Sequence, residues 1–182
     1  MTRTIVLVHG AWVTPASWDS FRGRYRARGY QVIAPPWPHE DRPIEQLRAS
    51  PAAELGRVGI PQLTAHYASI VRALPEPPIL VGHSIGGLVV QLLADRGLGS
   101  AVVSISPAPP RGVLPGLTAL RANLPVVLAW RSWDRALRMP FGRFASTFLN
   151  TTPVAERRAV YDRHVVPTPG ACSWTPWGGE PV

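Results

Sequence analysis

The chain has 182 residues, of which 46% are hydrophobic and 16% are charged. This balance excludes an intrinsically disordered protein and allows one domain with a core of its own. The formal net charge is +8, and every basic residue is an arginine. Because these arginines are spread along the chain rather than gathered in one tract, we do not expect a nucleic-acid partner.

Further classes of protein are excluded by what the sequence lacks. A single cysteine, Cys172, cannot form an internal disulfide or a cysteine-rich zinc site, and no phosphate-binding loop motif is present. The histidines and aspartates do not show the spacing of metal ligands, so we expect no metal or other cofactor. No apolar run reaches the roughly 18 residues of a membrane span, and the first apolar segment is too short for a signal peptide. We therefore expect a cytoplasmic protein.

Short runs rich in β-branched residues alternate with amphipathic segments in the first part of the chain. Strands are predicted at 4–8, 30–34, 79–81 and 101–105. Helices are predicted at 16–28, 60–74 and 86–96, and the proline-rich stretch 35–59 is expected to be irregular. Strands that alternate with helices in this way form right-handed βαβ units around a parallel sheet that is buried on both faces. The predicted fold class is therefore α/β with a parallel sheet.

The pattern changes after Ser106, where several prolines form a hinge-like stretch. We expect three regions: a core at 1–108, a helical cap region at 109–166, and an atypical tail at 167–182 that has neither helical nor strand period. In the cap region Trp130, Trp133 and Leu137 would share one helical face, and a further helix would run from about 152 to 164. Amphipathic helices alone do not distinguish a lid over a cleft from a helical subdomain.

The motif Gly82-His83-Ser84-Ile85-Gly86 lies directly between a predicted strand and a predicted helix. In that context G-x-S-x-G forms a nucleophile elbow, a sharp turn that raises the serine hydroxyl above the carboxyl ends of the strands. Glycine two residues before and two after Ser84 avoids a clash of side chains in this turn. The N-terminus of the following helix favours negative charge that develops at the site. We therefore expect Ser84 to be a nucleophile.

A second motif, His9-Gly10-Ala11-Trp12, follows the first strand. An oxyanion hole needs two backbone N–H groups that point at one atom. One is expected from Ile85, the residue after the nucleophile, and the other from Ala11 in the loop after the first strand. Gly10 would allow the backbone of this loop to pass close to a substrate.

The segments V-L-V-H-G-A-W and G-H-S-I-G-G together resemble the α/β-hydrolase superfamily. More narrowly, they are similar to small bacterial hydrolases of the esterase/lipase type and to the plant methylesterase and hydroxynitrile-lyase group. The resemblance covers residues 4–108 most strongly and implies Ser84 as nucleophile, Ala11 and Ile85 as oxyanion donors, and 109–166 as the family's cap. It also implies a small hydrophobic acyl or ester substrate, with Trp12 lining its pocket.

The resemblance further implies a catalytic triad in the chain order Ser, then Asp or Glu, then His. His164, the only histidine after Ser84, is expected at the end of a cap helix and is interpreted as a helix C-terminal residue. The side chain of His83 should point away from the site, and His9 is interpreted as structural. His39 lies in the proline-rich loop over the expected cleft mouth and is a candidate for substrate contact.

The later acidic residues do not supply the missing triad acid, because Asp95, Asp134 and Asp162 all lie on helices or in the cap region. A serine without an adjacent base is a poor nucleophile, so we expect the chain to be weakly active or inactive as an ester hydrolase. The last strands of the family sheet are also expected to be missing, as in a C-terminally truncated member. Residues 101–105 would then form an open apolar edge that favours self-association.

Three hypotheses for function remain open. The first is a serine hydrolase for carboxylic esters or related acyl compounds that is incomplete in this chain. The second is a non-catalytic relative that binds a small hydrophobic ligand in the same cleft. The third is a half-enzyme that another chain, or a second copy of this one, completes. The sequence does not identify the substrate.

Overall fold

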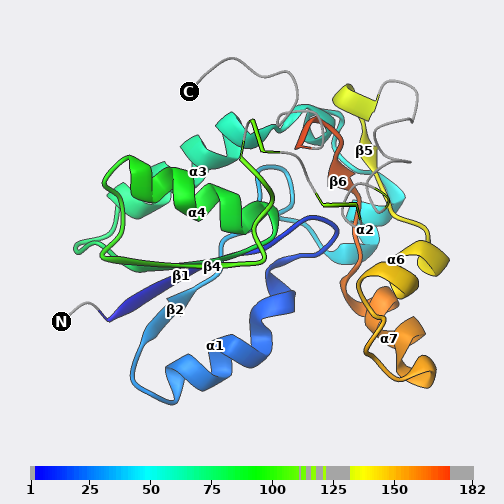
Figure 1. Cartoon of the computed structure of the whole chain (residues 1–182), viewed down its shortest axis with the longest axis horizontal. Helices are drawn as coiled ribbons and strands as arrows, with labels where there is room; N and C mark the ends of the chain where they lie inside the picture. The colour runs from blue at the N-terminus through cyan, green and yellow to red at the C-terminus, as the bar shows by residue number, and fades with distance from the viewer. Residues whose placement is uncertain (1–2, 111, 114–115, 118–120, 122–131, 173–182) are drawn as a thin grey trace.

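The computed structural model describes residues 3–110, 112–113, 116–117, 121 and 132–172 (Figure 1). Its main sheet has four parallel strands in the order β2-β1-β3-β4. The strands are β1 (Thr4–Val8), β2 (Gln31–Ile33), β3 (Ile79–His83) and β4 (Ala101–Ile105). The predicted α/β class and parallel sheet are confirmed, and two of the strands have the predicted bounds.

Strand β1 shows why the sheet is buried on both faces. Val6 and Val8 pack into the larger apolar cluster, which also contains residues of the helices α3 (Ile60–Arg72) and α4 (Ile85–Asp95). Ile5 and Leu7 point the other way, into a cluster with Trp18. Figure 1 shows the corresponding layers, with α3 and α4 on one face of the sheet and α1 (Asp19–Arg26) on the other. The alternation of side chains along a strand thus places helices on both faces.

The proline-rich stretch 35–59 contains short helices, so the prediction that it is irregular is wrong in part. These are α2 (Ile44–Ala49) and the 3₁₀ helix η2 (Ala53–Arg57). A further 3₁₀ helix, η1 (Pro15–Trp18), precedes α1. Pro43 directly precedes α2, and proline suits the start of a helix because its missing N–H would have no partner there. A residue that suggested a loop therefore marks the beginning of a helix.

The described part of the cap region contains a short strand as well as helices, and Leu117 and Arg121 are also helical. Its described elements are the 3₁₀ helix η3 (Ser132–Asp134), β5 (Ala136–Leu137), α6 (Phe141–Thr147) and α7 (Val154–His164), followed by β6 (Thr168–Pro169). The helix expected to end near residue 164 is confirmed. The prediction that Leu137 shares a helical face with Trp133 is wrong, because Leu137 lies in a strand that pairs antiparallel with Thr168. Trp130, the third residue of that predicted face, lies outside the described residues. The same pairing corrects the prediction of a tail without strand structure; residues 173–182 lie outside the described residues.

Helices α6 and α7 lie beyond the carboxyl ends of the main strands, as Figure 1 shows. They form a separate apolar cluster around Phe144 and Tyr161, and this cluster includes Trp12 from the loop after β1. The Tyr161 hydroxyl donates to the carbonyl of Met139 at 2.7 Å. The helical part of the cap is thus packed against the loop that was predicted to form part of the site.

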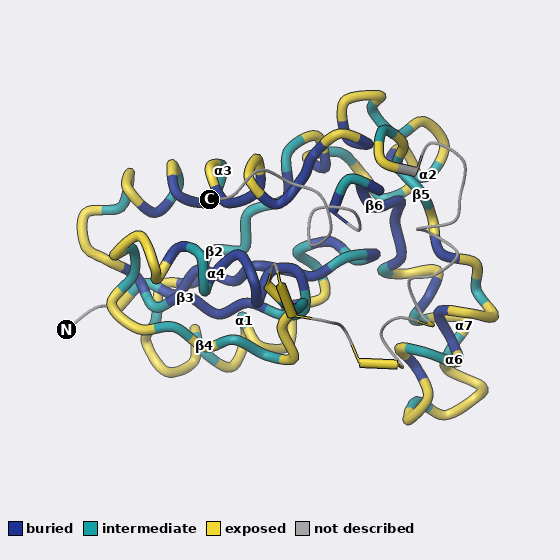
Figure 2. Tube along the Cα trace, turned by 45° about the horizontal axis from the view of Figure 1, so that its top comes forward, coloured by how far each residue is buried: buried dark blue, intermediate teal, exposed yellow. Residues whose placement is uncertain are grey.

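Strand β4 is an edge of the sheet among the described residues. Figure 2 shows its trace as intermediate or exposed, whereas β1 and β3 are mostly buried. Val103, at its centre, is 47% exposed. The predicted open apolar edge is therefore present in the described part of the chain.

Candidate active site

Ser84 lies in the sharp turn between β3 and α4. Its backbone angles are φ 55° and ψ −120°, a left-handed conformation that is rare for a residue with a side chain. The Ser84 N–H donates to the Ile105 carbonyl at 3.0 Å, and the Ser84 carbonyl accepts from the Ala108 N–H at 2.9 Å. Strain of this kind costs about 1–3 kcal/mol and persists only where the surroundings enforce it. These bonds to the end of β4 and the segment after it hold the turn in place.

The turn is in direct contact with the loop that follows β1. A side chain at Gly86 would collide with the backbone of Val8 and His9, and one at Gly10 would lie 2.9 Å from the Ser84 Cβ atom. Only glycine at both positions lets the two backbones approach this closely. Adjacent parallel strands thus bring the two sequence motifs together at one end of the sheet.

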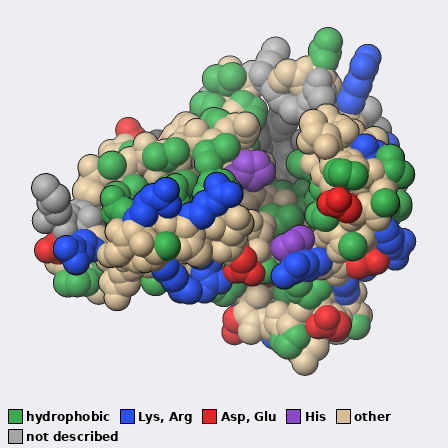
Figure 3. Space-filling view, turned by 90° about the horizontal axis from the view of Figure 1, so that it is seen from below, with side chains coloured by type: hydrophobic (Ala, Val, Ile, Leu, Met, Phe, Trp, Pro, Cys, Tyr) green, Lys and Arg blue, Asp and Glu red, His purple; other side chains and the backbone are tan. Residues whose placement is uncertain are grey.

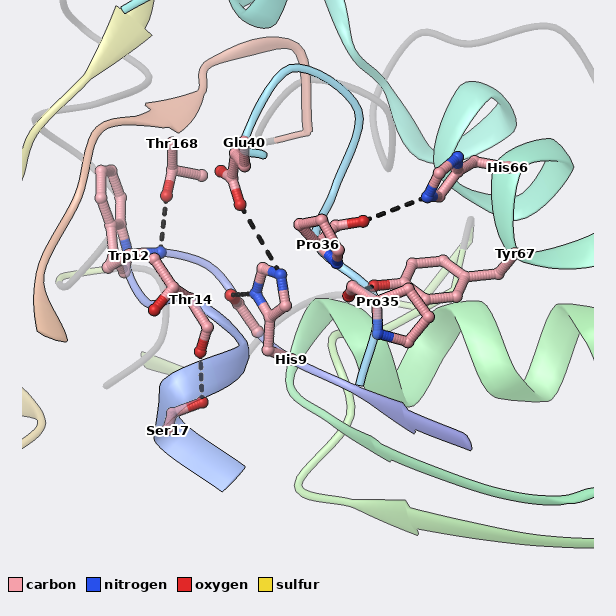
Figure 4. A network of polar contacts seen from close by, with 11 residues as sticks. His9, Trp12, Thr14, Ser17, Pro35, Pro36, Glu40, His66, Tyr67 and Thr168 are labelled. Atoms are coloured by element: carbon pink, nitrogen blue, oxygen red, sulfur yellow. Dashed lines mark hydrogen bonds and ion pairs between the residues drawn. The ribbon is translucent and has the colours of Figure 1, made fainter. Parts of the chain in front are cut away.

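The two expected oxyanion donors, Ala11 and Ile85, lie on either side of this contact. Ile85 is the first residue of α4, and the first N–H groups of a helix have no acceptor within the helix. Ala11 follows Gly10, and after it Trp12 turns the chain with a φ of 72°. The Trp12 N–H donates to the Thr168 hydroxyl at 2.5 Å, as Figure 4 shows. Sequence reasoning missed Thr168, because nothing local indicates a bond between residues so far apart.

A buried polar pair lies behind this loop. The ring of His9 stacks on Trp37 with ring centroids 4.9 Å apart, and its Nε2 is 3.6 Å from Glu40 Oε2. The separation alone would suit an ion pair, but both side chains are only 1% exposed. Burial lowers the pKa of His9 to about 4, so the imidazole is neutral near pH 7. Burial also raises the pKa of Glu40 well above its usual value, which favours the protonated carboxyl. The sequence placed Glu40 in an irregular loop and did not indicate its burial.

A cavity of about 460 Å³ adjoins the elbow. Its polar lining includes His9, Gly10, Ser17, His83 and His164. Its apolar lining comes from Val13, Trp18, Phe21, Ile105, Phe144, Phe148, Leu149 and Val160. Figure 3 shows histidine side chains beside a hollow on this face, with hydrophobic side chains within it. A cavity that is mainly apolar with a few polar groups at the reacting centre suits a small apolar ligand.

A larger cavity, of about 640 Å³, lies between η2 and the segment around β5. Arg57 and Arg135 are among its lining residues, but no residue of the elbow or of the loop after β1 is. The chemistry of the two motifs therefore points to the smaller cavity.

The five histidines of the chain are all described, and none is hydrogen-bonded to the Ser84 hydroxyl. His83 and His164 both line the cavity, and burial lowers the pKa of each. The pKa of His164 is lowered further by Arg163 and raised by Asp19, so an acidic residue lies near this ring. Both imidazoles are thus neutral near pH 7 and able to accept a proton, although neither is bonded to the serine.

The two predicted pocket residues do not lie among the residues that line the cavity. Trp12 is 2% exposed and packs with the cap cluster. His39 is exposed and has a left-handed φ of 68° in the loop that also carries Glu40. Their contact with substrate stays a prediction.

Clusters of metal ligands and membrane-spanning helices are both absent from the described residues. Within those ranges no group of three His, Cys, Asp or Glu residues is arranged to hold a metal ion. In the same part of the chain no helix has both the length and the hydropathy needed to cross a bilayer.

Several solved structures of hydrolases resemble this fold over most of the chain. An extracellular alpha/beta-hydrolase from a Paenibacillus species, described as sharing structural and functional homology with tobacco salicylic acid binding protein 2, superposes with a TM-score of 0.69 at 26% identity, over 91% of this chain and 66% of its own. A pyrethroid hydrolase from Sphingobium faniae gives a TM-score of 0.67 at 24% identity, over 98% of this chain and 71% of its own. A monoacylglycerol lipase from Paleococcus ferrophilus gives 0.63 at 24% identity, over 96% and 64%.

The chain therefore spans about two thirds of the length of these solved relatives. A comparison of the sequence with curated proteins finds no match. The family model described as alpha/beta hydrolase family matches residues 5–182, which is nearly the whole chain. The parallel sheet, the serine turn and this match agree, and the chain belongs to the alpha/beta hydrolase family.

Proposed function

We propose that this chain carries the nucleophile and oxyanion portion of a serine hydrolase that acts on carboxylic esters or related acyl compounds. The observation that carries the proposal is the contact between Ser84 and the loop of Gly10, in which a strained serine meets the backbone predicted to bind an oxyanion. Membership of the alpha/beta hydrolase family supports a hydrolytic reaction. The apolar lining of the adjacent cavity supports an acyl group without charge.

In this proposal Ser84 Oγ attacks the ester carbonyl carbon. The carbonyl oxygen, which becomes negatively charged, accepts hydrogen bonds from the N–H groups of Ala11 and Ile85. The positive end of the α4 dipole adds to this stabilisation, because Ile85 is the first residue of that helix. The bond between the carbonyl carbon and the alkoxy oxygen breaks, and the proton lost by Ser84 Oγ ends on that oxygen, so an alcohol leaves and an acyl-serine remains. Water then hydrolyses the acyl-serine to the free acid and restores the Ser84 hydroxyl.

We expect slow turnover, because no histidine is bonded to Ser84 Oγ. Loss of a triad member reduces turnover on the order of 10⁴–10⁶-fold and leaves the contributions of the oxyanion hole and of binding. Covalent labelling is irreversible and its product accumulates, so a slow reaction of Ser84 is easier to detect by labelling than by ester turnover.

The apolar cavity favours a second candidate function, the binding of a small hydrophobic ligand without chemistry. Its walls include several aromatic side chains from α1, α6 and their surroundings, among them Phe21, Phe144 and Phe148. Such a lining binds an apolar chain whether or not Ser84 reacts.

A half-enzyme completed by a second copy is distinguished by a labelling rate that rises with protein concentration.

A fluorophosphonate probe tests the proposal. We expect slow covalent labelling of the native chain at Ser84, identified by peptide mass, and slow release of nitrophenol from a short-chain nitrophenyl ester. Ser84→Ala should abolish both signals. Ser20→Ala, which alters an exposed serine of α1, should leave both unchanged. Labelling that persists in Ser84→Ala would contradict the proposal, and binding of a fatty acyl ligand with no labelling would favour the second candidate.

A further inference from the structure

The side chains of His9 and Glu40 are buried next to each other behind the loop that follows β1. Burying two polar groups costs free energy, and folding of a loop does not require it. His9 Nε2 and Glu40 Oε2 lie 3.6 Å apart, and neither atom has a hydrogen-bond partner among the described residues. Trp37 covers the other side of the imidazole ring. The two atoms therefore face each other in an otherwise apolar setting, in which Tyr67 and Cys172 are the further titratable groups that interact with Glu40.

The second nitrogen of the ring establishes where the protons are. His9 Nδ1 lies 3.0 Å from the carbonyl oxygen of Gly10, which can only accept, so Nδ1 carries the hydrogen (Figure 4). In a neutral ring Nε2 is then a bare acceptor. Glu40 Oε2 faces this acceptor at 3.6 Å, which suits a protonated carboxyl, and burial favours the neutral form of both groups by lowering the pKa of His9 and raising that of Glu40.

His9 donates to the Gly10 carbonyl, which belongs to the same peptide unit as the Ala11 N–H, the predicted oxyanion donor. The carbonyl of Gly10 and the N–H of Ala11 form one planar trans peptide, so they point in opposite directions. A bond that fixes the Gly10 oxygen therefore also fixes the direction of the Ala11 N–H. Accepting that bond also polarises the peptide and makes its N–H a better donor.

We propose that Glu40 is a positioning residue: through His9 it holds the Gly10–Ala11 peptide in the orientation in which the Ala11 N–H serves as an oxyanion donor. The proposal rests on the proposed function, because that function assigns Ala11 its role. It requires only groups within the described chain, and no group is oxidised or transferred. Glu40 acts through another residue and touches no substrate.

Variants at Glu40 separate this role from simple packing. Glu40→Gln keeps the shape and supplies an amide N–H to His9 Nε2, whereas Glu40→Leu fills similar space and supplies no donor. The matched control is Glu45→Gln, at an exposed glutamate on α2. Should Glu40→Leu fail to fold, Glu40→Met takes its place as an unbranched side chain without a donor.

The first measurement is the rate at which a fluorophosphonate labels Ser84, since the phosphoryl oxygen of the adduct occupies the oxyanion hole. We expect Glu40→Leu to be labelled about 10-fold to 100-fold more slowly than the native chain. This loss of rate is no larger than the loss expected when one oxyanion donor is removed. Glu40→Gln and Glu45→Gln should label near the native rate. A folded Glu40→Leu variant that labels as fast as the native chain would overturn the inference.

The second measurement does not depend on reactivity. Nitrogen-15 NMR of the imidazole should show the proton of native His9 on Nδ1, and Glu40→Leu should lose this fixed tautomer and shift the Ala11 amide proton. A native His9 protonated on Nε2, or an Ala11 amide unaffected by Glu40→Leu, would overturn the inference even if no labelling occurs. Absence of labelling with the expected NMR result would instead count against the proposed function.

Discussion

At the scale of single residues, the site is where the backbone departs from its preferred conformations. Four residues other than glycine have a positive φ: Trp12, His39, Ser84 and Ser106, all within the described ranges. Ser84 and Trp12 lie in the two motifs, and Ser106 follows the strand end to which the Ser84 N–H is bonded. Strained residues of this kind gather at functional sites, where the surrounding structure stabilises what the residue itself disfavours.

The strain at Ser84 predicts an unusual order of stabilities. Both Ser84→Ala and Ser84→Gly remove the hydroxyl, but only glycine removes the Cβ atom that disfavours a φ of 55°. We expect the glycine variant to be more stable than the alanine variant by about 1 kcal/mol, measured by urea unfolding. At Ser20, in helix α1, the same two substitutions should give the reverse order, because alanine favours a helix. Equal stability of the two Ser84 variants would show that the turn is unstrained.

The buried His9 and Glu40 predict opposite pH dependences of stability. Burial lowers the pKa of His9 from 6.5 to about 4, so its contribution is present above pH 6.5 and is lost as the pH falls towards 4. Burial raises the pKa of Glu40 well above 4.5, so its contribution is present below pH 4.5 and is lost as the pH rises towards the folded pKa. Where the two ranges overlap, above pH 4.5, the two slopes have opposite sign and offset each other.

Removing one partner should expose the slope of the other. We expect the free energy of unfolding of Glu40→Gln to decrease as the pH falls below 6.5, by about 3 kcal/mol in total. That of His9→Gln should decrease as the pH rises above 4.5, and the native chain should vary less than either. Urea midpoints across this range measure the effect, with His39→Gln, at an exposed histidine, expected to follow the native chain. Parallel curves for all four proteins would contradict the neutral pair.

At the scale of elements, α7 is attached to the core by a side chain from another helix. The Arg48 guanidinium, on α2, donates to the carbonyls of Tyr161, Asp162 and Val165 at 2.7–3.2 Å. These carbonyls lie at the C-terminus of α7, where intrahelical donors run out and positive charge is favourable. That of Tyr161 also accepts from the Val165 N–H. One arginine thus provides the C-terminal cap of a helix more than a hundred residues later in the chain.

Loss of this cap should loosen α7 without disturbing the sheet. We expect Arg48→Met to reduce the free energy of unfolding by about 2 kcal/mol and to speed hydrogen exchange of the last amides of α7. Arg48→Lys should recover only part of the loss, because one ammonium cannot reach three carbonyls as a planar guanidinium does. The control, Arg42→Met, removes a single exposed bond to Ser50 and should have a smaller effect. Unchanged exchange in α7 would contradict the capping role.

Local patterns predicted the elements whose own residues carry a clear run of β-branched side chains or a helical period. Residues 101–105 are rich in β-branched side chains and form a strand with the predicted bounds. Ala136 and Leu137 were assigned to a helix because their spacing fits one, yet they pair with Thr168 and Pro169, and no local period encodes such a partner. The elbow could be predicted because its chemistry is written in five consecutive residues, whereas Glu40 became part of the site only through a fold that brings its loop against His9.

At the scale of the whole molecule, the sheet ends in an exposed strand. The outer side of β4 has no strand partner among the described residues, and its central side chain, Val103, is half exposed. Unpaired backbone groups beside apolar side chains are a template for pairing with another chain. About a third of each of the solved relatives has no counterpart in this chain. The surface of this chain therefore need not resemble theirs.

This edge predicts self-association that depends on protein concentration. We expect the mean mass in sedimentation velocity to rise with concentration for the native chain. Val103→Lys should hold it at the monomer mass, since a lysine on an edge strand opposes pairing. Val154→Lys, at an exposed valine that begins α7, is the control and should associate like the native chain. A native chain that stays monomeric throughout would contradict the prediction.

The bond between Trp12 and Thr168 has a consequence for the order in which the site is made. On the ribosome the elbow can form once β4 and residue 108 have emerged, because every bond described for Ser84 lies within that part. The loop of Ala11 is held at its far side by Thr168 and Val166, which are synthesised some 60 residues later. A nascent chain therefore carries Ser84 before the backbone beside it is secured, and the loop of Ala11 reaches its described geometry only after residue 168 has been made.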